Sequence, residues 1–145
     1  MSSQQSALDE TTYEEITRLC ADGDSLASEA KYEAAVAEYN KAWELVPEPK
    51  NQWDASTWIL AAIADACFLL GKKKSAREAL EYAMTCPGAL GNSFLHLRLG
   101  QVLFDADEKD AAANELMRAY MGAGAEIFDN DNPKYLEFLK TKAKI

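Results

Sequence analysis

The 145-residue chain has little of what catalytic, metal-binding and membrane proteins need. It holds one histidine, His96, and three scattered cysteines, Cys20, Cys67 and Cys86. These are too few for a metal site, a disulfide framework or a Cys–His catalytic pair, so we expect buried free thiols, no metal and no cofactor. No run of about 18 uncharged apolar residues occurs, which predicts no membrane span. The first residues lack both a basic start and an apolar stretch, so we expect a cytoplasmic location.

Positive charge is also scarce. The chain has 15 Lys and Arg against 24 Asp and Glu, a formal net charge of −9. The imbalance is concentrated in residues 1–50, which hold eleven acids and four bases. A nucleic-acid-binding protein needs a cationic footprint, so this composition argues against DNA or RNA as the partner. Two alternatives remain for the acidic charge: it attracts a basic protein surface, or it serves solubility alone.

Alternating strand patterns are missing, and glycine and proline punctuate the chain at the ends of helix-like segments. Pro47, Gly71 and the Pro87-Gly88 pair mark three such ends. Residues 1–10 are polar and unpatterned and are predicted to be a flexible N-terminus, and the acidic segment 126–132 is predicted to be irregular. The predicted helix N-caps are Asn51, Asn92 and Asp107. The predicted helices span about 13–30, 32–46, 51–70, 73–86, 93–105, 107–121 and 133–144.

One spaced phrase occurs three times. A small residue is followed by an apolar residue three positions later, Ala at twelve, a large apolar residue at sixteen and Ala at nineteen. The three copies are Gly23, Leu26, Ala35, Tyr39 and Ala42; Ala64, Cys67, Ala76, Leu80 and Ala83; and Gly100, Leu103, Ala112, Leu116 and Ala119. Corresponding positions lie 41 residues apart and then 36 apart. A period of this size predicts stacked helical repeats in which small residues let paired helices approach closely.

The phrase resembles the tetratricopeptide repeat (TPR) family, over roughly residues 13–121. The resemblance implies an all-α fold, a right-handed α-solenoid of three TPR-like helix pairs plus a C-terminal capping helix. The expected organisation is a single domain over residues 11–145, with repeats at about 13–49, 51–88 and 92–122 and a capping helix at about 133–144. The chain departs from the family pattern in the extra residues around 50–56, which are expected to lengthen the helix that follows.

In the TPR family the first helix of each pair lines a concave groove that binds a peptide or a partner helix. By register, the resemblance places eight candidate protein-binding residues in such a groove: Asp24, Trp58, Asp65, Phe68, Phe94, Arg98, Gln101 and Asp105. The Lys, Asn and Arg side chains of the well-known carboxylate clamp are replaced at matching positions by Cys20, Asp24, Ala61 and Asp65. The predicted groove therefore suits a partner with a basic, or mixed basic and apolar, surface.

Alternatives remain open for several of these residues. Trp58, Phe68 and Phe94 are either binding anchors or part of the core between repeats. Asp24 and Asp65 either meet a cationic partner, stay solvated or pair with Arg98. Trp53, on the extra residues, is the candidate for an exposed anchor.

The later part of the chain resembles small bacterial TPR proteins, some encoded beside Rhs-type polymorphic toxins. The stretches that carry this resemblance are Trp53–Trp58, Cys86–Gly88, His96–Gly100 and Pro133–Leu136. It implies a non-catalytic immunity protein that binds and neutralises a cognate toxin. The alternatives are a class II type III secretion chaperone, which is also a small acidic three-repeat TPR protein, and a general TPR adaptor.

Overall fold

The computed structural model describes residues 8–145. Seven α-helices and two short 3₁₀ helices lie between Leu8 and Ile145, and this part of the chain contains no strand. The all-helical prediction is therefore confirmed. The predicted flexible N-terminus, residues 1–10, falls mostly outside the described residues. The helices form two compact units, the first ending at Ala89 and the second covering Leu90–Ile145.

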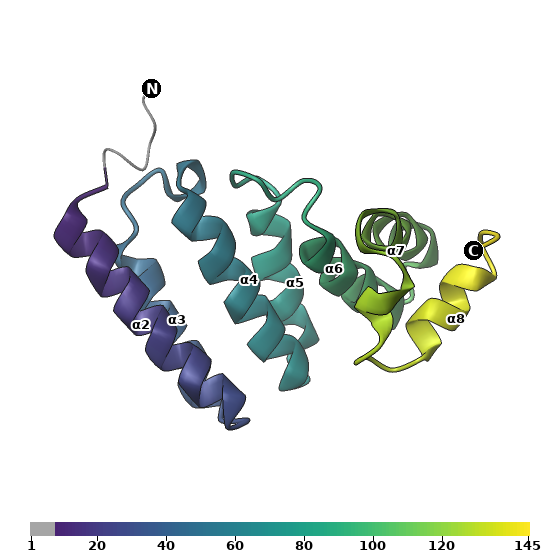
Figure 1. Cartoon of the computed structure of the whole chain (residues 1–145), viewed down its shortest axis with the longest axis horizontal. Helices are drawn as coiled ribbons and strands as arrows, with labels where there is room; N and C mark the ends of the chain where they lie inside the picture. Colours follow the sequence, from purple (N-terminus) through teal and green to yellow (C-terminus); the bar gives the residue numbers. More distant parts are fainter. Residues whose placement is uncertain (1–7) are drawn as a thin grey trace. The chain divides into compact units, whose positions relative to one another are not determined.

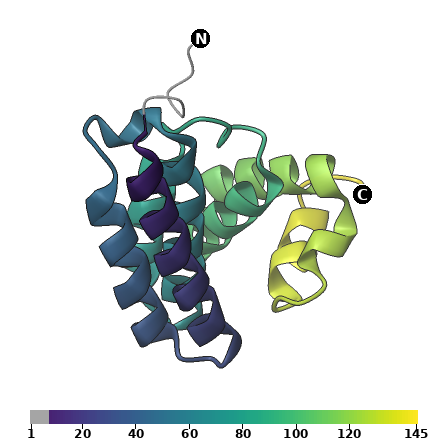
Figure 2. The same cartoon turned by 60° about the vertical axis from the view of Figure 1, so that its left-hand side comes forward.

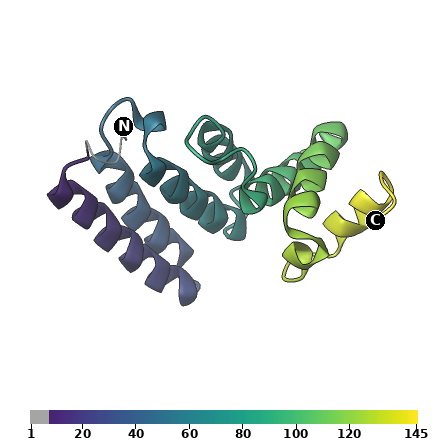
Figure 3. The ribbon, with the colours of Figure 1, turned by 45° about the horizontal axis from the view of Figure 1, so that its top comes forward.

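The first unit contains four α-helices and one 3₁₀ helix. Helices α2 and α3 form one antiparallel pair, α4 and α5 form the next, and α3 packs against both α2 and α4 (Figures 1 and 3). The connections within each pair are short, which places consecutive helices side by side. The bounds are α2 Glu10–Ser28, α3 Tyr32–Leu45, η1 Lys50–Gln52, α4 Asp54–Leu69 and α5 Lys73–Ala83.

The second unit contains one helix pair and a shorter C-terminal helix. Helices α6 and α7 pack along each other, and α8 contacts both α7 and η2 (Figure 2). The predicted capping helix exists, but it covers only seven residues, with Thr141 as its C-cap. The segment predicted to be irregular contains the 3₁₀ helix η2. The bounds are α6 Ser93–Asp105, α7 Lys109–Ala123, η2 Ala125–Phe128 and α8 Lys134–Lys140.

The repeated phrase lies where paired helices cross. A Cβ atom added at Gly23 would come within 2.5 Å of the Tyr39 ring, and one added at Gly100 within 2.7 Å of the Leu116 side chain. Each glycine therefore meets the large residue of its own copy of the phrase. The alanines of all three copies are fully buried, at 0% exposure. The predicted role of the small residues, close approach of two helices, is confirmed.

A turn that the sequence predicts only at Gly71 repeats in all three helix pairs with the same register. The first helix of each pair ends in one residue with positive φ, after which a backbone N–H returns to a carbonyl five positions earlier. The three residues are Ala30 at φ 61°, Gly71 at 82° and Asp107 at 64°. They lie 41 and 36 residues apart, as the phrase does. This is the Schellman ending, which usually takes glycine, and only one of the three positions has it.

Two predicted helix starts are wrong. Asp107 belongs to the left-handed turn just described, so α7 begins at Lys109 instead. Asn51 does not cap α4, because Lys50–Gln52 forms a 3₁₀ turn and α4 begins at Asp54. Residues 50–53 therefore wrap back onto the end of α3, and of the extra residues only 54–56 belong to α4. The third predicted cap is confirmed, since the Asn92 side chain accepts from the Leu95 amide at 3.2 Å.

The side chains of the extra residues show why they wrap back. The Lys50 ammonium donates to the carbonyls of Trp43 and Val46, both at 2.7 Å, at the end of α3. The Trp53 indole N–H donates to the Pro47 carbonyl at 2.8 Å, and only 8% of Trp53 is exposed. These bonds add donors to carbonyls at and just beyond the C-terminal end of α3. The prediction of Trp53 as an exposed anchor is therefore wrong.

Substitution of Ala30 by glycine tests the repeated turn. Alanine pays a steric cost of about 1–2 kcal/mol in the left-handed region, against a smaller entropic cost for glycine. We expect Ala30→Gly to raise the free energy of unfolding in urea by about 0.5–1 kcal/mol. Ala21→Gly, at an exposed position inside α2, is the matched control and should lower it by about 1 kcal/mol. Equal losses in both variants would contradict the assigned turn.

Candidate functional site

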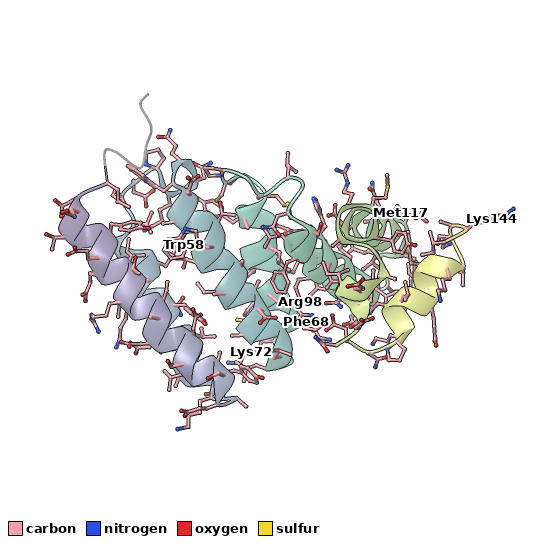
Figure 4. The ribbon with its side chains drawn as sticks, in the orientation of Figure 1. Trp58, Phe68, Lys72, Arg98, Met117 and Lys144 are labelled. Carbon is pink, nitrogen blue, oxygen red and sulfur yellow. The ribbon has the colours of Figure 1, made fainter. Side chains whose placement is uncertain are left out.

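The candidate residues on α4 share one face. Trp58, Ala61, Asp65 and Phe68 follow the helical spacing of three, four and three residues. The Trp58 ring is 38% exposed, whereas Asp65 and Phe68 are half-buried. Figure 4 shows Trp58 in the N-terminal part of α4 and Phe68 towards its C-terminal end. Trp58 is therefore the accessible tryptophan of the predicted site, and the buried Trp53 is not.

A tyrosine from α3 joins this face to α2. The Tyr39 hydroxyl donates to the Asp24 carboxylate at 2.7 Å. The ring lies against Gly23, where any side chain would collide with it. Burial raises the pKa of the Tyr39 hydroxyl, and so do the hydrogen bond to Asp24 and the nearby Cys20 and Asp65 groups. Asp24 on α2 thus binds this hydroxyl, and the charge of Asp65 on α4 also acts on it.

We call Asp24, Tyr39, Asp65 and Trp58 the acidic face of the first unit. Two of its members are carboxylates, one is a half-exposed indole, and the tyrosine orients Asp24. Asp24 is solvent-exposed, so its remaining lone pairs can accept from a cation. Carboxylates next to an aromatic ring suit a lysine or arginine side chain, which brings both charge and an apolar stem.

Cys20 lies beside this face but is not a nucleophile at neutral pH. The thiol is 8% exposed, and burial, with a smaller contribution from Asp24, raises its pKa to about 11. Burial also raises the pKa of the Cys67 and Cys86 thiols. Reactive cysteines need the opposite environment, exposed and electropositive. The three cysteines are free and buried, as the sequence predicts.

The candidate residues of α6 are held inside the second unit. Arg98 is only 7% exposed. Its guanidinium donates to Gln101 Oε1 at 2.7 Å and to Asp131 at 2.9 Å, and it lies 5.3 Å from the centre of the Phe94 ring. Gln101 is fully buried, at 0% exposure. These side chains form an internal polar network rather than an open surface.

Asp105 belongs to the same network. It accepts from the Tyr135 hydroxyl at 2.8 Å and pairs with the Lys134 ammonium at 3.0 Å. Burial raises the pKa of the Tyr135 hydroxyl, as do the Asp105 hydrogen bond and the Asp105 and Asp131 charges, while Arg98 opposes this rise. None of Asp131, Lys134 and Tyr135 is among the binding residues predicted from the sequence.

The eight candidate residues therefore fall into two sets. Four lie on α2 and α4 of the first unit, and four lie on α6 of the second, where segment 131–135 binds two of them, Arg98 and Asp105. Tyr39 was missed as a site residue, although one signal for it exists. The other two copies of the phrase have Leu80 and Leu116 at this position, and a buried tyrosine needs a partner for its hydroxyl.

His96 has a structural position. The ring is 2% exposed; Nε2 accepts from the Gly91 amide at 3.0 Å, which leaves the proton on Nδ1 to be donated to Glu115 at 2.6 Å. Both ring nitrogens are thus used. Among residues 8–145, no group of three or more His, Cys, Asp or Glu side chains is arranged to hold a metal ion. None of the described helices is long and apolar enough to cross a membrane.

Comparison with known proteins supports the fold. The chain is similar to the crystal structure of the Sgt2 TPR domain from Aspergillus fumigatus, with a TM-score of 0.65 and 20% sequence identity. The alignment covers 88% of this chain and 76% of that chain. No protein-family model and no curated protein sequence matches the chain. The fold is that of a TPR-like helical solenoid.

Thiol labelling tests the environment of Cys20. With a pKa near 11 rather than the ordinary 9.0, the thiolate fraction at pH 8 is about a hundredfold lower than in the unfolded chain. We expect a disulfide reagent at pH 8 to label Cys20 at least about a hundredfold more slowly in native protein than in denaturant. The folded state holds the Cys20 proton more tightly than the unfolded chain does. The contribution of this thiol to the free energy of unfolding should therefore be complete below pH 9 and decline as the pH rises towards 11. Equal labelling rates by mass spectrometry would contradict the buried position.

Proposed function

We propose that this chain is a non-catalytic protein-binding module whose acidic face receives a basic protein partner. The observation that carries the proposal is the hydrogen bond from the Tyr39 hydroxyl to Asp24, a hydroxyl whose pKa the Asp65 charge also raises. Asp65 shares a face of α4 with the exposed Trp58. The TPR-like fold supports it, because solenoids of this kind present surfaces rather than enclosed reaction sites.

Charge complementarity favours a cationic partner. The net charge of −9 accelerates encounter with a basic surface and disfavours nucleic acid. Charge-assisted hydrogen bonds from Lys or Arg to a carboxylate contribute about 1.5–3 kcal/mol each. Tyr39 fixes the orientation of Asp24 before the partner arrives, so little side-chain entropy is lost on binding.

Trp58 supplies the apolar part of the proposed site. Tryptophan is enriched among residues that dominate binding energy, especially where polar groups surround it. Phe68 is a weaker candidate, because it is half-buried and the Lys73 ammonium lies 5.1 Å from its ring centre. A partner that places a basic residue at the carboxylates and an apolar one on Trp58 would satisfy both parts.

At a finer level, we propose an immunity role in which the chain neutralises a cognate bacterial toxin domain. The resemblance to small TPR proteins encoded beside Rhs-type toxins supports this role. The acidic charge is consistent with it, because a toxin that acts on nucleic acids or nucleotides needs a basic active site, which an acidic protein can cover. Neutralisation would then result from occlusion, without chemistry by this chain.

The acidic face is tested by neutralising its carboxylates. The partner is first captured from a lysate of the source organism, identified and purified. We expect Asp24→Asn/Asp65→Asn to weaken its binding by about tenfold or more and to flatten the salt dependence of the affinity. Glu33→Gln/Glu44→Gln, at two exposed positions of α3, removes the same net charge and should change the affinity little.

A second control separates binding from folding. Tyr39→Phe removes the hydrogen bond to Asp24 and leaves both carboxylates, so the partner should still bind with its salt dependence intact. Equal affinities for the acidic-face variant and the α3 control would contradict the proposed surface. The immunity role has its own readout: co-expression of the chain should restore growth of cells that produce the captured protein. A partner that is a secreted, unfolded translocator segment would overturn that role.

A further inference from the structure

Helix α8 and the residues just before it bind side chains of α6 that the sequence predicts as ligand contacts. Tyr135 and Lys134 both bind Asp105, at 2.8 and 3.0 Å. Asp131, just before the helix, pairs with Arg98 at 2.9 Å. One short segment thus takes up two charged residues of α6 that the sequence marks as candidate ligand contacts.

Aromatic contacts continue the same connection. The Phe104 ring of α6 meets the Tyr135 ring edge-on, with centres 5.6 Å apart and planes at 77°. The Phe138 ring lies 4.9 Å from Phe104 and is tilted by 55°. The Lys109 ammonium lies 4.1 Å from the centre of the Phe104 ring. A partner segment at this place would therefore need aromatic side chains as well as charges.

The contact residues of this segment are close together in sequence. Lys134 and Phe138 stand one turn apart on α8 with Tyr135 between them, and Asp131 lies in the bend before the helix. Each type meets a complement on α6: an acid meets Arg98, a base meets Asp105 and two rings meet Phe104. The segment is built like a ligand of α6.

The attachment of α8 is weak enough to be exchanged. A helix of seven residues does not hold its shape alone in water, and only Tyr135 and Leu139 within it are buried. The Lys134 side chain is 46% exposed in its ion pair, and exposed pairs contribute about 0–1 kcal/mol. Aromatic pairs add about 0.5–1.5 kcal/mol each. The Arg98–Asp131 pair, with side chains 9% and 13% exposed, is the more buried of the two ion pairs that hold the segment.

We propose that the face of α6 formed by Arg98, Phe104 and Asp105 is a second protein-binding surface, and that segment 131–138 is its built-in competitor. The partner is a segment of the same chemistry, an acid followed by a lysine and two aromatic residues at helical spacing. This inference rests on the protein-binding function proposed above and adds a surface and its regulation. The tether gives the competitor an effective concentration of about millimolar. The apparent affinity for a partner is then the intrinsic affinity multiplied by the fraction of time that the competitor leaves α6 open.

The test uses the full chain and a labelled synthetic peptide with the sequence of residues 129–142. In the parent protein the tethered copy occupies α6, so the peptide should bind weakly. Lys134→Ala/Tyr135→Ala weakens the tethered copy, and we expect the peptide to bind it about tenfold more tightly by fluorescence anisotropy. Glu137→Ala/Lys140→Ala, at two exposed positions of α8, is the matched control and should bind the peptide like the parent.

Two further measurements locate the binding and check the fold. Adding Asp105→Asn to the released variant should abolish the gain, because it removes the negative charge that pairs with the lysine of the peptide and weakens the bond to its tyrosine. In hydrogen exchange, the released variant should lose protection in α8 and keep it in α6 and α7. Loss of protection in all three helices would overturn the proposal, since α8 would then be part of the fold rather than a displaceable segment.

The remaining outcomes also overturn the proposal. No gain in peptide binding, or a gain that survives Asp105→Asn, would remove α6 as the site. A dimer of the released variant on size exclusion, formed by exchange of α8 between copies, would assign the surface to self-association instead of a separate partner. None of these results bears on the acidic face, which lies in the first unit and is tested with different residues.

Discussion

Each of two helix pairs closes where a glycine leaves room for one large side chain: Gly23 for the Tyr39 ring and Gly100 for Leu116. At a crossing of this kind the backbones approach until no Cβ atom fits between them. Dispersion and hydrophobic contacts both grow as that distance falls. The same contact sets the register of the pair, and so decides which side chains point outward. The acidic face and the α6 face both follow from it.

The acidic face shows how one crossing also orients a binding group. In the first copy of the phrase the large residue is tyrosine, so its hydroxyl reaches past Gly23 to Asp24. A leucine there, as at Leu116, would fill the space but leave the carboxylate unfixed. The Tyr39 hydroxyl thus links the packing of this crossing to the orientation of the Asp24 carboxylate. The carboxylate is held as a fixed acceptor where a partner's cation would bind.

The sequence was sufficient for the helix pairs because small residues at regular intervals report directly on crossings. It predicted the Asn92 cap correctly, since that side chain bonds a nearby amide. The predictions for Asn51, Asp107 and Trp53 were wrong. The conformations of these residues depend on backbone turns and on carbonyl contacts that form only in the folded chain. The contacts of Tyr135 and Lys134 with α6 were missed for the same reason. The surface roles of Asp24, Asp65 and Trp58 remain predictions.

A double-mutant cycle at the Gly100 crossing tests the central claim most directly. Gly100→Ala should lower the free energy of unfolding by about 1–3 kcal/mol through overpacking, although alanine is the better helix former. In a Leu116→Ala background the same change should cost little or even stabilise, because the added methyl group enters the space that leucine leaves. We expect a coupling energy of at least about 1 kcal/mol. An equal loss from Gly100→Ala in both backgrounds would show that the glycine does not set this crossing and would contradict the account.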